Sequence, residues 1–231
     1  NATLNNNAYS KMQIDAINYI EWCEFLALSE KDKYPFRPEK LENISTNQDE
    51  TKPYISFDGN TALFVRKVKQ RSKNEESFYQ QTSFITKDVL CQAFLEFNED
   101  LGIWEFDEGF PINEFENVVN KPTKVSLTAD NKQMYFSYLD KASGKYQIYC
   151  SHSVGGVWSK PENIGNIVND ATANLVDPFI TADGNTLYFS SDKKGGQGGY
   201  DIWVTHKSKN SSWLKPTNLG KRINTPRNET S

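Results

Sequence analysis

The chain has 231 residues, of which 13% are aromatic, and a formal net charge of -4 at pH 7. The aromatic content excludes an intrinsically disordered chain, and the mildly acidic balance argues against a nucleic-acid-binding protein, which needs a concentrated basic surface. No apolar stretch reaches the roughly 18 residues of a transmembrane helix. The length suits one large all-β domain or two small domains.

Residues 10–30 have the apolar spacing of an α-helix. Apolar side chains recur every three or four residues and form one helical stripe, at Met12, Ala16, Ile20, Cys23 and Ala27. Neighbouring apolar residues widen the stripe, which predicts a helix that is buried on more than one side. Pro35 and Pro38 would end it. We therefore expect an N-terminal helical segment within residues 1–35.

Three segments of residues 36–231 share one pattern. Each has a short apolar strand, a turn that begins at Asp58, Asp130 or Asp183, and a second apolar strand. The Asp-Gly or Asp-Asn pair supplies the positive φ that a tight hairpin needs. A third strand and a Trp-x-x-Pro-x-Asn-x-Gly closure follow in the second and third units, and the first unit has a looser closure from Trp104 to Pro111.

Four strands in a unit of about 50 residues are typical of a β-propeller blade. A β-sandwich would also have regular short strands, but it would not usually repeat the same turn and closure. We therefore expect an all-β fold of three complete four-stranded blades that follow the N-terminal α-helix. The predicted blades span residues 50–120, 121–170 and 171–225, and an insertion within residues 66–92 lengthens the first.

The aromatic residues at matching positions of the units are predicted to be core residues, namely Tyr135, Trp158, Tyr188, Trp203 and Trp213. The three cysteines, Cys23, Cys91 and Cys150, are too few for a disulfide framework and could form at most one bridge. The commoner interpretation is that they are small buried apolar side chains.

The third unit in particular resembles the WD40-like repeats of TolB-type propellers, most closely those in OmpA-family envelope proteins of Bacteroidota. The matching segments are residues 177–192, 195–203 and 213–225. The N-terminal stripe is similar to the last helix of a tetratricopeptide segment. The resemblance implies a periplasmic protein associated with the outer membrane, whose partners are other envelope proteins, in some members the type IX secretion and gliding machinery. Peptidoglycan would be a partner only through an OmpA-like domain, which is not part of this chain.

The glycine-rich run from Gly195 to Gly199 could suggest a phosphate-binding loop. Such a loop needs a helix after it, whereas a strand of the pattern Tyr-Asp-Ile-Trp-Val follows here. The run is therefore predicted to join the second and third strands of a blade. With the loops at 66–81 and 140–145, the loop at 192–199 is a candidate for partner contact, and its candidate binding residues are Gly195, Gly196, Gln197, Gly198 and Tyr200.

The sequence predicts no metal, no cofactor and no catalytic residue. His152 and His206 follow strands of separate blades, so they should not share a zinc ion. A glycosidase would need two carboxylates, and the predicted first strands, Tyr-Ile-Ser, Ser-Leu-Thr and Phe-Ile-Thr, contain none. We expect a non-enzymatic protein-interaction scaffold. The alternatives are a propeller that binds carbohydrate or peptidoglycan fragments and, less favoured, a propeller glycoside hydrolase.

Residues 38–50 resemble residues 216–229, which indicates that both are the end of one blade and the lead-in to the next. Propellers have about four to eight blades, so the three units should belong to a larger propeller. We therefore expect the 231-residue chain to self-associate, or to melt at a lower temperature than a chain extended by further blades. Sedimentation and thermal melting test this, and a strictly monomeric chain with an equal melting temperature would contradict it.

Overall fold

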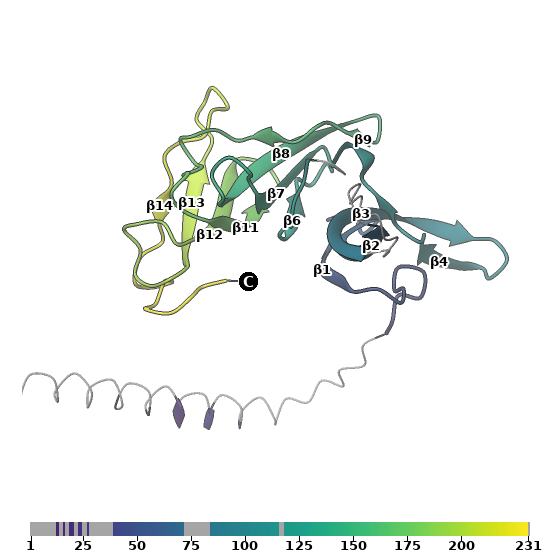
Figure 1. Ribbon diagram of the computed structural model, residues 1–231, viewed down its shortest axis with the longest axis horizontal. Helices are drawn as coiled ribbons and strands as arrows, with labels where there is room; N and C mark the ends of the chain where they lie inside the picture. The colour runs from purple at the N-terminus through teal and green to yellow at the C-terminus, as the bar shows by residue number, and fades with distance from the viewer. Residues whose placement is uncertain are drawn as a thin grey trace, which may run out of the picture. The chain divides into compact units, whose positions relative to one another are not determined.

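The computed structural model describes residues 39–71, 84–115 and 118–230, together with seven separate residues between positions 13 and 27. The chain divides into two compact units, Asn1–Lys40 and Leu41–Ser231. The described part of the second unit contains three antiparallel β-sheets (Figure 1). No helix among the described residues is long and apolar enough to cross a membrane.

The first sheet has the strand order β1-β2-β3-β4, and β5 also pairs with β3. Its strands are β1 (Glu50–Ile55), β2 (Thr61–Arg71), β3 (Phe84–Asn98), β4 (Ile103–Phe106) and β5 (Phe110–Pro111). A 3-10 helix, Asn113–Phe115, follows. β3 is long enough to pair first with β2 and then, beyond the end of β2, with β4.

The second sheet has the order β10-β8-β7-β6, with β9 paired to β8, and the third has the order β11-β12-β13-β14. The strands of the second sheet are β6 (Val125–Leu127), β7 (Gln133–Leu139), β8 (Tyr146–Val154), β9 (Val157–Trp158) and β10 (Glu162–Asn163). Those of the third are β11 (Leu175–Ile180), β12 (Thr186–Ser191), β13 (Asp201–His206) and β14 (Thr217–Asn218). The prediction of three repeated antiparallel sheets is confirmed, although the first two sheets have five strands instead of four.

The segment predicted to close the first unit, from Trp104 to Pro111, does contain the closing strand, but only at its end. This segment forms two elements: β4, which makes a hairpin with the end of β3, and β5, which returns to pair with Cys91 in the middle of β3. The chain turns between them at Gly109, whose φ of 70° favours glycine. β5 is therefore the closing strand of the first sheet, and β3–β4 is a hairpin arm that corresponds to the shorter β8–β9 hairpin of the second sheet.

The three hairpin turns are built alike. Each turn aspartate accepts a hydrogen bond of 2.6 Å from a hydroxyl two residues earlier and one of 3.0–3.1 Å from the backbone N–H two residues later. The hydroxyl bonds hold the pKa of Asp58, Asp130 and Asp183 below the ordinary value. Positive φ occurs at the next residue in each turn, at Gly59, Asn131 and Gly184. These aspartates are turn residues, as predicted.

Alternate side chains of the second sheet pack against different neighbours, as the two-residue period of a strand requires. Met134 and Phe136 of β7 belong to the core shared with Leu63 of the first sheet. Tyr135, between them, belongs to the core shared with Leu187 of the third sheet. The second sheet is therefore buried on both faces.

Two tryptophans of the predicted closures lie at the two junctions between sheets. Trp158 is buried, and its indole N–H donates a 2.7 Å hydrogen bond to Gln92 of the first sheet. Trp213 is half-buried and meets the Tyr135 ring of the second sheet edge-on, with 6.0 Å between ring centroids. Tyr135 and Trp203 are buried as predicted, whereas Tyr188 and Trp213 are only half-buried. No further sheet covers Tyr188 in the described part of the chain.

The predicted N-terminal helix falls mostly outside the described residues, and no α-helical element is defined among those that are described. Ala16, Ile20, Cys23 and Ala27 are described and exposed, so the predicted burial of this stripe is not found at these four positions. All three cysteines are free. Cys91 and Cys150 are buried as predicted, and burial raises the pKa of each thiol to about 11, while Cys23 is exposed.

The different burial of the two closure tryptophans predicts different effects of their removal. Trp158→Ala should lower the free energy of unfolding by about 3–5 kcal/mol, because a buried ring and its hydrogen bond are lost. Trp213→Ala should cost only about 1–2 kcal/mol, because that ring is half exposed. Chemical denaturation of both variants checks this, and equal losses would contradict it.

Candidate functional site

The predicted binding loop folds onto the buried carboxylate of Asp201 at the start of β13. The backbone N–H groups of Gln197 and Gly198 donate to this carboxylate, and the side-chain amide of Asn218 donates to it at 3.1 Å. Gly195, Gly196, Gln197 and Gly198 are exposed at their surface, and Tyr200 is half-buried. The loop joins β12 to β13, as predicted, and its donors at 197 and 198 already bind a protein carboxylate.

Steric crowding explains why glycine occupies two positions of this loop. A Cβ atom on Gly196 would lie 1.8 Å from the Asp201 carboxylate, and one on Gly198 would lie 2.2 Å from the carbonyl oxygen of Arg227. The loop also hydrogen-bonds the segment after β14, through the Gly199 N–H to the Arg227 carbonyl at 3.2 Å and the Tyr200 N–H to the Asn228 side chain at 2.9 Å. The glycine run therefore fixes residues 225–229. Whether it also contacts a partner stays a prediction.

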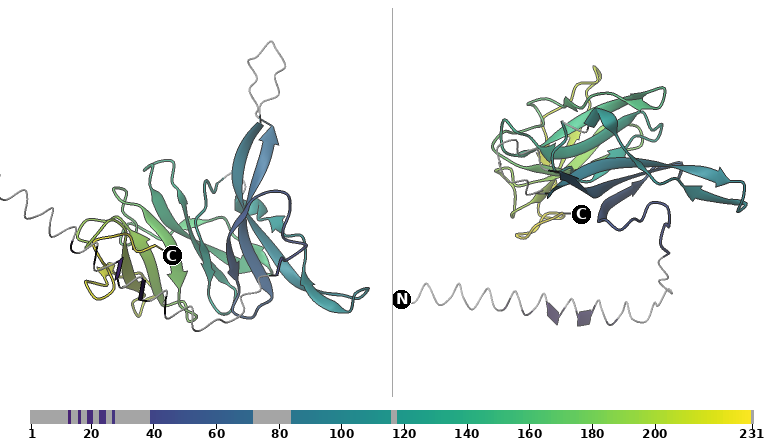
Figure 2. Two further views of the ribbon diagram at one scale, coloured as in Figure 1. Left: turned by 90° about the horizontal axis from the view of Figure 1, so that it is seen from below. Right: turned by 45° about the vertical axis from the view of Figure 1, so that its right-hand side comes forward.

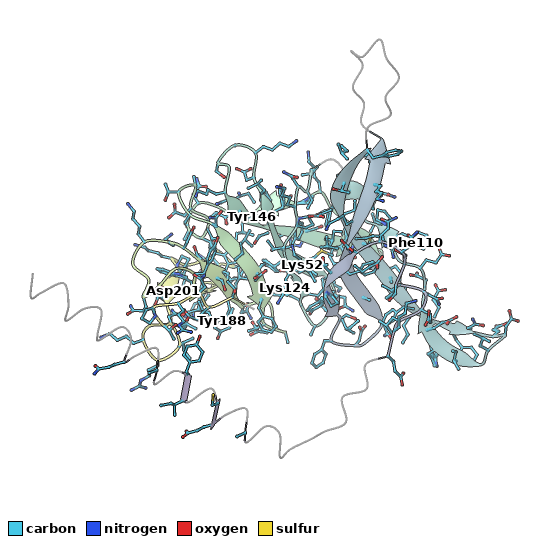
Figure 3. The ribbon with its side chains drawn as sticks, turned by 60° about the horizontal axis from the view of Figure 1, so that its bottom comes forward. Lys52, Phe110, Lys124, Tyr146, Tyr188 and Asp201 are labelled. Carbon is cyan, nitrogen blue, oxygen red and sulfur yellow. The ribbon has the colours of Figure 1, made fainter. Side chains whose placement is uncertain are left out.

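Tyr200 is the predicted site residue that the fold brings together with other polar side chains. Burial and the Asp192 carboxylate raise the pKa of its hydroxyl, and Asp177 and Tyr146 lie near enough to add to this shift. Tyr146 begins β8 as Tyr200 precedes β13, and burial likewise raises its pKa, with Asp88 of β3 nearby. Figure 3 labels Tyr146 and Asp201 in their two sheets. Aromatic hydroxyls and carboxylates thus gather at the same end of neighbouring sheets.

The first strands do contain carboxylates, contrary to the sequence analysis. β1 begins with Glu50, which forms a 2.9 Å ion pair with Arg66, and β11 contains Asp177. The predicted strand cores were too short, because both first strands extend beyond a β-bulge, between Thr51 and Tyr54 in β1 and between Val176 and Phe179 in β11.

The other predicted loops differ in what the structure describes. The loop predicted at 66–81 is strand β2 up to Arg71, and residues 72–81 lie outside the described part. The loop at 140–145 is a turn in which the backbone N–H of Ser143 donates to the Asp140 carboxylate and lowers its pKa. His152 and His206 are exposed in separate sheets, and no group of metal-ligating side chains gathers within the described ranges.

The β3–β4 arm exposes aromatic side chains that the sequence analysis missed. Phe97 and Trp104 face each other across the two strands with 5.4 Å between ring centroids, and 49% and 66% of their surfaces are exposed. A hollow of about 160 Å³ lies elsewhere along the arm, lined by Asn43, Glu96, Phe97, Asn98, Glu105, Phe106 and Asp107. The arm projects from the first sheet (Figures 1 and 2). The signal in the sequence is the alternation of apolar residues on both sides of the turn at 99–102.

No protein-family model matches this chain, and no curated protein matches it in sequence. Among solved structures, distant matches include β-propeller proteins. TolB from Acinetobacter baumannii is 17% identical with a TM-score of 0.41, over 75% of this chain and 33% of that one. The β-propeller domain of the trilobed protease from Pyrococcus furiosus is 10% identical with a TM-score of 0.44, over 75% of this chain and 43% of that one.

A puromycin-hydrolysing peptidase from Mycobacterium tuberculosis is 12% identical with a TM-score of 0.46, over 75% of this chain and 24% of that one. The chain thus spans less than half the length of each of these proteins. The fold is that of an all-β protein with distant structural similarity to β-propeller domains.

The crowding around Gly198 predicts that a larger residue at this position destabilises the fold. Gly198→Ala should lower the free energy of unfolding by about 1–3 kcal/mol, because its Cβ would meet backbone atoms of residues 225–227. It should also speed hydrogen exchange at the Glu229 amide, which donates to the Tyr200 carbonyl at 2.7 Å. Lys194→Ala, at an exposed position of the same loop, is the control and should change neither quantity. Unaltered exchange in Gly198→Ala would contradict the prediction.

Proposed function

We propose that the three sheets are consecutive blades of a larger β-propeller that acts as a non-enzymatic protein-interaction scaffold in the bacterial cell envelope. The proposal rests on a contrast between the repeated sheets and the β3–β4 arm. The polar side chains of the repeated turns hydrogen-bond one another, whereas the arm exposes Phe97 and Trp104 to solvent. Large exposed aromatic residues on a rigid support favour protein recognition.

The carboxylates and thiols of the repeats have structural roles, in turns, in one loop and in the core, which favours a non-enzymatic function. Asp58, Asp130 and Asp183 close turns, and Asp201 holds the loop before β13. The two buried thiols have raised pKa values and are therefore poor nucleophiles at neutral pH. A location in the periplasm at the outer membrane, and a role beside the type IX secretion machinery, belong to the proposal through the resemblance of residues 177–225 alone.

The uncovered face of the third sheet supports a larger propeller. Tyr135 and Ser126 of the second sheet are buried against the third, and Tyr188 and Phe179 occupy the equivalent positions in the third sheet. Tyr188 is only half-buried, and 56% of the Phe179 surface is exposed. Exposed apolar surface costs about 25 cal/mol per Å², so a further sheet on this face would be stabilising.

The lead-in segments give the same indication. Thr46 and Thr225 each donate a hydroxyl hydrogen bond to a glutamate four residues later, Glu50 and Glu229. Glu50 is also bound by Arg66 from the next strand of its blade, whereas Glu229 Oε2 is buried without a hydrogen-bond partner. A further blade with a basic residue at the position of Arg66 would satisfy this oxygen.

The experiment that tests the proposed function compares binding with turnover. The purified chain should capture a specific protein from envelope extract of its source cells, and the purified partner should bind in titration calorimetry with a Kd of about 1 μM. Panels of glycoside and peptide substrates should show no turnover. Saturable turnover that a single carboxylate substitution abolishes would overturn the proposal, as would cell fractionation that places the protein in the cytoplasm.

A carbohydrate-binding role has one specific observation in its favour, the group of Tyr146, Tyr200, Asp177 and Asp192 at one end of the second and third sheets. Aromatic rings beside carboxylates suit the faces and hydroxyls of a sugar. Titration with peptidoglycan fragments separates the two functions: binding that Tyr200→Ala abolishes would favour the carbohydrate role over the scaffold.

A further inference from the structure

We draw no further inference here: the strongest candidate, the surface patch of lysines and exposed Phe84 and Ile85 on the ribbon where residues 67–71 of β2 pair with residues 84–88 of β3, carries nothing, because Lys67 is already paired with Asp49 and nothing in the structure shows what covers the patch.

Discussion

Sheet-to-sheet packing is the constraint on which the rest of this structure depends. A four-stranded sheet with apolar residues in alternation on both faces cannot be stable alone, because each face needs a neighbour. The second sheet satisfies this requirement: Phe136 packs toward the first sheet and Tyr135 toward the third. The hydrogen bond from Trp158 to Gln92 and the edge contact of Trp213 with Tyr135 reinforce the two junctions.

The packing of one sheet on the next requires that the chain cross between them at a fixed place. Asn169 does this between the second and third sheets, and Asn224 repeats it after the third, because each side chain bonds both the N–H and the carbonyl of a strand residue, Ile148 in one case and Ile202 in the other, at 2.8–3.0 Å. Both are buried, so a side chain without the amide would leave strand groups unsatisfied. Asn169 thus fixes the place where the chain leaves the second sheet for the third.

The repeated parts of the fold could be predicted because their signals are local. An aspartate followed by glycine or asparagine specifies a turn through hydrogen bonds within a few residues, and all three turns formed as expected. The loop from Gly195 to Tyr200 was also placed correctly between two strands. What the loop packs against could not be predicted, because the segment at 225–229 that it fixes is distant in the sequence.

The arm was missed for the opposite reason. Trp104 and Pro111 match the closures of the other units, and in the first two units this segment forms two strands, β4 and β5 in the first and β9 and β10 in the second. The pattern does not show that β3 is long enough to outrun β2, so that Trp104 pairs with Phe97 in a ladder of its own. Burial also depends on neighbours that the sequence does not identify, which is why Tyr188 and Trp213 were both expected in the core and lie only half inside it.

Stability and recognition are separated on this chain, and that separation favours a scaffold. The polar side chains of the repeats form the turns and hold the loop before β13. The β3–β4 arm contributes least to the stability of the sheets, because β4 pairs only with the end of β3. Two carboxylates, Glu96 and Glu105, lie opposite each other in this hairpin. Natural sequences depart from local consistency mainly where function requires it.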